Sequence, residues 1–169
     1  WLADSLYATA PFITSIKDAG EDFIFRVKQG DHKNLFKAIE TAPYESFKTT
    51  VGKGKTTIAH RWYKDIQLNA STDITVSVIR AFAITTDKDG NVSSTVIGVW
   101  ATNLDVNETT VVDITKAARS RWKIENECFN ALKNQGYDLT HNWGHTNGES
   151  FNFYLLIMLA FYIHQILEM

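Results

Sequence analysis

Residues 1–28, WLADSLYATAPFITSIKDAGEDFIFRVK, contain the alternation of strand and helix patterns that decides the fold class. An apolar start ends at Asp4, and Pro11 then fits the first turn of a helix. Large apolar residues recur at every second position over residues 22–28, which predicts a strand. A short helix is expected around residues 35–39. We therefore expect a β-α-β-α opening, which is typical of an α/β protein.

The central part of the chain, residues 44–104, has the composition of antiparallel strands. Three segments rich in Val, Ile, Thr and aromatic residues are separated by turn sequences, and DKDGN (87–91) is typical of a hairpin turn. These segments are 58–68, 74–84 and 92–102. No Pro- or Ser-rich linker flanks the region, so we expect a β-rich insertion packed against the α/β part.

The C-terminal part, residues 105–169, is predicted to be helical. Apolar residues recur at helical spacing over residues 111–135, and the apolar run 153–163 predicts a buried core helix. That run is shorter than the roughly 20 residues that span a bilayer, so we expect no membrane contact. The chain is thus divided into an α/β part (1–43), the insertion (44–104) and this helical part.

The composition excludes several classes of protein. With 169 residues, of which 44% are hydrophobic, the chain is expected to be globular. Its 17 basic and 19 acidic residues give a net charge of −2, so no overall positive field points to nucleic acid. The single cysteine, Cys128, excludes an internal disulfide and favours a cytoplasmic protein. Because residue 1 is Trp rather than Met, we expect a fragment of a longer protein.

Glu125 is the first candidate functional residue. On a regular helix it falls near the centre of the apolar arc, between Trp122 and Phe129. A buried carboxylate without a partner costs several kcal/mol, so it must be paired, protonated or bound to a metal. One interpretation is an ion pair with Arg121, four residues earlier, and the other is a catalytic or metal-binding carboxylate.

Asp4 is the second candidate, because it follows the first expected strand. Ligands in α/β folds usually bind at the carboxyl ends of the strands, although an Asp at this position is also a common turn cap. Together, Asp4 and Glu125 would make half of a two-metal site, which normally needs a third carboxylate.

Several motifs resemble those of DDE transposases of the insertion-sequence-four type. The helix sequence RWKIENECFNALK (121–133), followed by QGY (135–137) and LTHN (139–142), is similar to the signature that carries the family's third catalytic acid. The opening DSLY (4–7), with FIFRVK (23–28) and GDHK (30–33), looks like the segment around the second acid. HRW (60–62) and WATNL (100–104) look like the family's β-rich insertion.

This resemblance implies a ribonuclease-H-like core in which three carboxylates hold two Mg²⁺ or Mn²⁺ ions. The ions serve to cut DNA at the ends of the element and to join those ends to a target. By position, Asp4 matches the second acid and Glu125 the third, whereas the first would lie upstream of Trp1. The resemblance also implies a homodimer of the complete protein on paired DNA ends, and we expect this fragment to be inactive alone.

The signature also implies two DNA contacts near Glu125. Arg121 matches the arginine of the Tyr-Arg-Glu-Lys signature, and Lys133 lies one residue after the position of its lysine. Ala118 stands where the signature has Tyr. The alternative function is a degenerate, non-catalytic remnant that binds DNA or a partner transposase.

A second set of DNA contacts is predicted in the insertion, where five basic residues occur without an acidic one over residues 46–64. Aromatic residues are interleaved with them, and an aromatic ring beside a phosphate contact can stack on an unpaired base. The candidate contacts are Lys53, Lys55, Arg61 and Trp62, within a cluster that also includes Lys48 and Lys64. The alternative is a solvated face of a hairpin.

Overall fold

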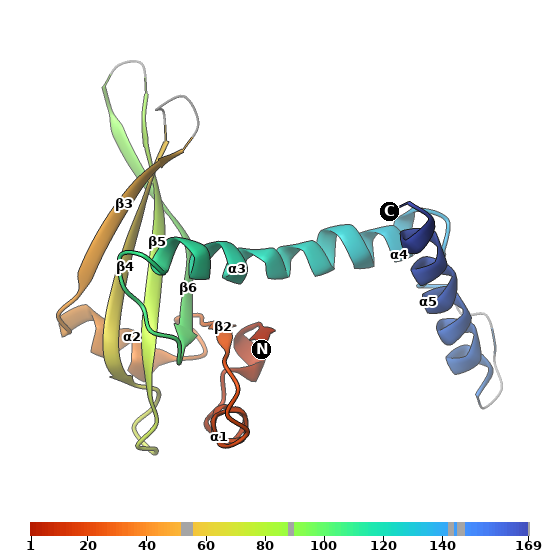
Figure 1. Ribbon diagram of the computed structural model, residues 1–169, viewed down its shortest axis with the longest axis horizontal. Coiled ribbons are helices and arrows are strands. Elements are labelled where there is room, and N and C mark those ends of the chain that lie inside the picture. Colours follow the sequence, from red (N-terminus) through yellow and green to blue (C-terminus); the bar gives the residue numbers. More distant parts are fainter. Residues whose placement is uncertain (52–55, 88–89, 142–143, 145–147, 169) are drawn as a thin grey trace. The chain divides into compact units, whose positions relative to one another are not determined.

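The computed structural model describes residues 1–51, 56–87, 90–141, 144 and 148–168, except for the side chains of Val51 and Glu125 (Figure 1). The chain divides into two compact units, Trp1–Arg119 and Ser120–Met169, and each is described by itself. The first unit contains all the strands of the described residues, and the second is helical.

The first unit is built on a six-stranded mixed sheet with the strand order β1-β2-β6-β5-β4-β3. The strands are β1 (Leu2–Ala3), β2 (Ile24–Arg26), β3 (Glu45–Val51), β4 (Thr56–Gln67), β5 (Thr75–Thr86) and β6 (Val92–Thr102). β1 and β2 are parallel, and the other neighbouring pairs are antiparallel. The three predicted central strands are confirmed as β4–β6. Their sheet continues into the α/β part because β6 pairs with β2.

Two helices follow the first two strands: α1 (Ala10–Asp18) follows β1, and α2 (Lys33–Thr41) follows β2. α1 begins where the sequence predicts, with Pro11 in its first turn. It ends before Gly20, whose φ of 72° lies in the left-handed region that favours glycine. The predicted β-α-β-α opening is therefore confirmed.

The sheet separates two hydrophobic cores because successive residues along a strand point to opposite faces. Tyr63 packs in the core with α1 and α2, whereas its neighbour Trp62 packs in the core with α3 (Val111–Lys123). The first core includes Ile13, Phe25, Leu35 and Val78, and the second includes Ile79, Trp100, Val111 and Ile114. The first unit therefore has three layers, with α1 and α2 on one face of the sheet and α3 on the other. The predicted α/β class is therefore confirmed, as a mixed sheet with helices on both faces.

The predicted helix over residues 111–135 is not one regular helix. α3 is followed by a π-helical stretch, Ile124–Phe129, and then by α4 (Asn130–Asn134). Hydrogen bonds in a π-helix join residues i and i+5, so the regular 100° spacing fails beyond α3. Trp122 is 60% exposed and Phe129 is also exposed, whereas a single apolar arc predicts that both are buried. That prediction is wrong for these two residues, and the changed spacing accounts only for Phe129, because Trp122 lies within α3 before the π-helical stretch.

The last helix, α5 (Glu149–Leu167), includes the predicted apolar run and extends beyond it. The ring of Tyr137 packs against Phe161, and its hydroxyl hydrogen-bonds Nδ1 of His164. No described residue of α5 is buried, so the predicted core burial is not observed. By length and composition α5 could cross a membrane, a criterion that core helices of soluble proteins also meet.

Candidate functional site

Asp4 lies directly after β1, at the carboxyl end of the parallel pair β1–β2. It is half-buried and caps a short 3₁₀ helix (Ser5–Tyr7), because its Oδ1 accepts a hydrogen bond from the backbone N–H of Leu6 at 3.1 Å. The turn-capping interpretation is thus confirmed. Among the described residues, Oδ2 of Asp4 has no hydrogen-bond or ion-pair partner, so this oxygen is available to a ligand.

The residue after Asp4 connects the ends of the two parallel strands. Ser5 is only 5% exposed, and its Oγ donates a hydrogen bond to Oδ2 of Asp31 at 2.5 Å. The same Oγ lies 3.3 Å from Nε2 of His32. Asp31 and His32 both follow β2, so these contacts fix the loop after β2 against the segment that carries Asp4.

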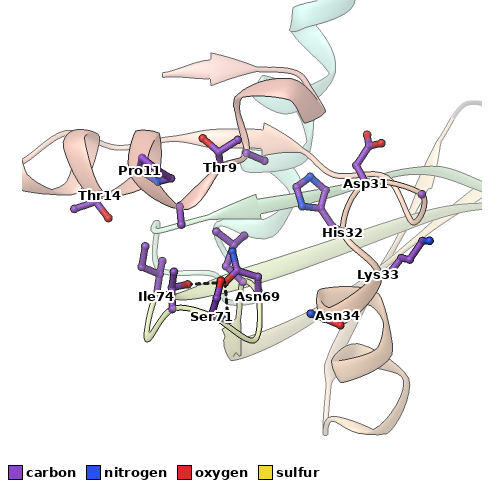
Figure 2. Close-up of a pocket in the computed structure, with 15 residues that line it drawn as sticks. Thr9, Pro11, Thr14, Asp31, His32, Lys33, Asn34, Asn69, Ser71 and Ile74 are labelled. Carbon is purple, nitrogen blue, oxygen red and sulfur yellow. Dashed lines mark hydrogen bonds between the residues drawn. The ribbon is translucent and has the colours of Figure 1, made fainter.

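An open pocket of about 860 Å³ lies beside these residues. Figure 2 shows that its labelled lining residues come from the start of α1, from the loop before α2 and its first turn, and from the turn between β4 and β5. Lys33 and Asn34 contribute polar groups from α2, and Asn69 and Ser71 contribute them from the turn. The Asn69 Oδ1 already accepts hydrogen bonds from the backbone and hydroxyl of Ser71.

The fit of this region to a divalent metal depends on Asp4. Carboxylate oxygens are the ligands that Mg²⁺ and Mn²⁺ prefer, and one oxygen of Asp4 is available. No group of three or more His, Cys, Asp or Glu side chains among the described residues could hold a metal ion. Asp4 therefore fits as one ligand of a larger donor set that the described side chains do not complete.

Glu125 lies in the second unit, within the π-helical stretch Ile124–Phe129, and its side chain lies outside the described residues. Neither the ion pair with Arg121 nor the pairing of Glu125 with Asp4 is tested, and both stay predictions. Of the two predicted DNA contacts nearby, Arg121 is half-buried and Lys133 is exposed.

The structure describes some of the predicted DNA contacts of the insertion and places them in different environments. Lys53 and Lys55 lie outside the described residues. Arg61 is exposed on β4, as expected for a DNA contact, and Lys64 pairs with Glu45 at 3.6 Å. Trp62 is 1% exposed in the core beneath α3, so its ring cannot stack on a base in this fold. This part of the prediction is wrong because Trp62 points to the other face of the sheet from Arg61.

No protein-family model matches the chain, and no curated protein matches it. Function must therefore be inferred from the residues, their geometry and the resemblance of the motifs.

Ser5, Asp31 and His32 are not predicted as site residues from the sequence. A signal was present, because GDHK (30–33) follows the predicted strand 22–28 and belongs to the motifs that resemble the family. The buried hydroxyl of Ser5 could not be anticipated, since only the tertiary fold brings it to Asp31, 26 residues later in the chain.

His60 was also missed as a buried ionisable group. It lies on β4 at 2% exposure, and burial lowers its pKa below the ordinary value of 6.5, although a backbone hydrogen bond at Phe47 opposes that shift. Its Nδ1 has no hydrogen-bond partner among the described residues. We interpret His60 as a neutral core residue.

Proposed function

We propose that the chain is part of the catalytic domain of a DDE transposase with a ribonuclease-H-like core. It would act in metal-dependent DNA cleavage and strand transfer at the ends of an insertion sequence. The observation that carries this proposal is the position of Asp4, directly after β1 at the carboxyl end of a parallel strand pair. Ligands in open α/β sheets bind at that edge, and the motif resemblance matches Asp4 to the family's second acid.

Asp4 and Glu125 would hold the ions together with the first acid, which the resemblance implies upstream of Trp1. Bound Mg²⁺ or Mn²⁺ ions would supply Lewis-acid stabilisation of the attacking and leaving oxygens of a phosphodiester. The available Oδ2 of Asp4 supports this role. Its other oxygen accepts the Leu6 N–H, which orients the carboxylate.

The backbone around Glu125 also supports the proposal. π-helical turns within α-helices are rare and occur frequently at functional sites, and the described one contains Glu125. Arg121 and Lys133 stand on the two sides of that turn and would contact DNA, as would Arg61, Lys53 and Lys55 of the insertion. We further propose that the complete protein acts in the cytoplasm as a homodimer.

The test is cleavage of DNA that carries the sequences flanking the gene, in Mn²⁺, by the chain joined to the segment that supplies the first Asp. Glu125→Gln and Asp4→Asn should each abolish cleavage, because each removes a ligand charge. Glu127→Gln is the matched control, since Glu127 lies on the same π-helical stretch and pairs with Lys123 at 4.0 Å. Cleavage that survives Glu125→Gln contradicts the proposal.

The alternative function is a non-catalytic remnant that binds DNA or a partner transposase. It predicts that the wild-type chain binds the same DNA but never cuts it. Mn²⁺-dependent product from wild type, lost in Glu125→Gln and retained in Glu127→Gln, excludes that alternative.

A further inference from the structure

Five side chains form a cationic and aromatic surface on the sheet, here called the arginine–aromatic patch. Its members are Tyr44, Lys48, Arg61, Arg80 and Phe82. Arg61 on β4 lies directly opposite Arg80 on β5, and the next pair on the same face is Ala59 with Phe82. Lys48 on β3 lies opposite Ala59, so it belongs to this face as well. In Figure 1, β3–β5 extend beyond α2.

The aromatic rings hold both guanidinium groups of the patch. The guanidinium carbon of Arg61 lies 4.9 Å from the ring centroid of Tyr44 and 5.1 Å from that of Phe82. The guanidinium carbon of Arg80 also lies 5.1 Å from the Phe82 centroid. These are cation–π distances, so two like charges are gathered around a single ring.

No ion pair with a carboxylate balances the two arginines in the part of the chain that the structure describes. Like charges directly opposite each other on neighbouring strands are destabilising. By strand register, the face around the patch on β3–β6 carries Ser46, Lys48, Thr50, Thr57, Ala59, Arg61, Arg80, Phe82, Ile84, Ser94, Val96 and Val99. The Nε of Arg80 is buried without a hydrogen-bond partner among the described residues. The patch therefore presents uncompensated positive charge.

The nearest acidic residue of the neighbouring strand does not offset this charge. Glu45 on β3 lies opposite Trp62, so it points to the other face, where it pairs with Lys64. Among the described residues, neither Arg61 nor Arg80 makes an ion pair.

We propose that the arginine–aromatic patch binds an unpaired DNA strand. Arg61, Arg80 and Lys48 would contact the phosphates, and the ring of Tyr44, which is 51% exposed, would stack on a base. An unpaired strand fits better than a duplex because stacked base pairs do not offer a base face to an aromatic ring. It also accounts for the exposed ring more directly than an acidic protein does, because each unpaired nucleotide supplies both a phosphate and a base face. The choice of DNA over RNA rests on the proposed function.

The experiment measures binding of a labelled oligodeoxythymidine of about 20 nucleotides to this chain, by fluorescence anisotropy in the absence of divalent metal. The double substitution Arg61→Gln with Arg80→Gln should weaken binding about tenfold or more. It should also reduce the salt slope by about 0.7 for each arginine. Tyr44→Leu should weaken binding about fivefold and leave the salt slope unchanged, because a stacked ring releases no counterions.

Lys64→Gln is the matched control, because Lys64 is a cation on the same strand that pairs with Glu45 on the opposite face. It should bind as wild type does. Circular dichroism and thermal unfolding check the fold of each variant, and Arg80→Lys serves as a second variant that keeps the charge. Arg80→Lys should retain the salt slope.

Four results would overturn the proposal. The first is wild-type affinity in the double arginine variant, and the second is tighter binding of duplex than of unpaired DNA. The third is tighter binding of oligouridine than of oligodeoxythymidine, and the fourth is equal binding of polyglutamate. Since no metal is present and no cleavage is measured, failure of this proposal is distinguishable from failure of the transposase proposal, which the Glu125→Gln assay tests.

Discussion

The hydroxyl of Ser5 donates a hydrogen bond to the carboxylate of Asp31 at 2.5 Å, and it thereby joins the loops that follow two parallel strands. Ser5 is the neighbour of Asp4, so the same contact restrains the candidate metal ligand. A hydroxyl that bonds a charged acceptor from a buried position contributes more to stability than an exposed hydroxyl does.

Ser5→Ala is expected to lower the free energy of unfolding by about 1–2 kcal/mol, because it leaves Asp31 without this donor. Urea unfolding followed by circular dichroism measures the change. Ser15→Ala is the control: the Ser15 hydroxyl also makes a hydrogen bond, to the carbonyl of Pro11, but it is exposed on α1. The control should change stability by about 0.5 kcal/mol or less. Equal effects of the two substitutions would contradict the tethering role of Ser5.

The buried His60 should make the free energy of unfolding depend on pH. Burial lowers the pKa of His60 below 6.5 in the folded state, so the unfolded chain takes up a proton at a higher pH than the folded chain does. The contribution of neutral His60 to the free energy of unfolding is fully present above pH 6.5 and is lost as the pH falls below that value. Unfolding in urea between about pH 7.5 and 5 should therefore show a decreasing free energy.

The variant His60→Gln should show a flatter curve over the same range, because it cannot be protonated. If the curve of His60→Gln runs parallel to that of wild type, another group causes the pH dependence.

Local patterns predicted much of the first unit. Pro11 marked the start of α1, and alternating apolar residues located β4–β6 within two residues at most of their ends, because these signals depend on neighbouring residues alone. The pairing of β6 with β2 was outside the reach of such patterns. It joins segments more than 70 residues apart, and no local signal specifies that partner.

The candidate site was predictable only in part, for the same reason. Asp4 was identified by its place after a strand, and the capping role also proposed for it is observed. Trp62 was misassigned because its burial depends on which face of β4 meets α3. The π-helical turn that contains Glu125 changes the phase of the helix, and an assumed regular spacing cannot reveal it.

The two tryptophans whose predicted environments were wrong give a matched pair for a stability test. Trp62→Ala should destabilise the protein by about 3–5 kcal/mol, since it removes a fully buried ring from the core beneath α3. Trp122→Ala removes a ring that is 60% exposed and should cost about 1 kcal/mol or less. Chemical denaturation measures both. A larger loss in Trp122→Ala would mean that the ring of Trp122 is covered in solution.

Gly98 permits the close packing of Trp100 in the same core. A Cβ at position 98 would lie 2.5 Å from the Trp100 ring, which is closer than real Cβ contacts allow. Because Trp100 is held between the sheet and α3, its rigid ring can move away only by disturbing the core. Gly98→Ala should therefore destabilise the protein by about 1–3 kcal/mol. Gly30→Ala is the control, since a Cβ there would meet no atom within 4 Å, and it should be nearly neutral or slightly stabilising. Equal unfolding free energies for the two variants would show that the Trp100 ring can shift without cost.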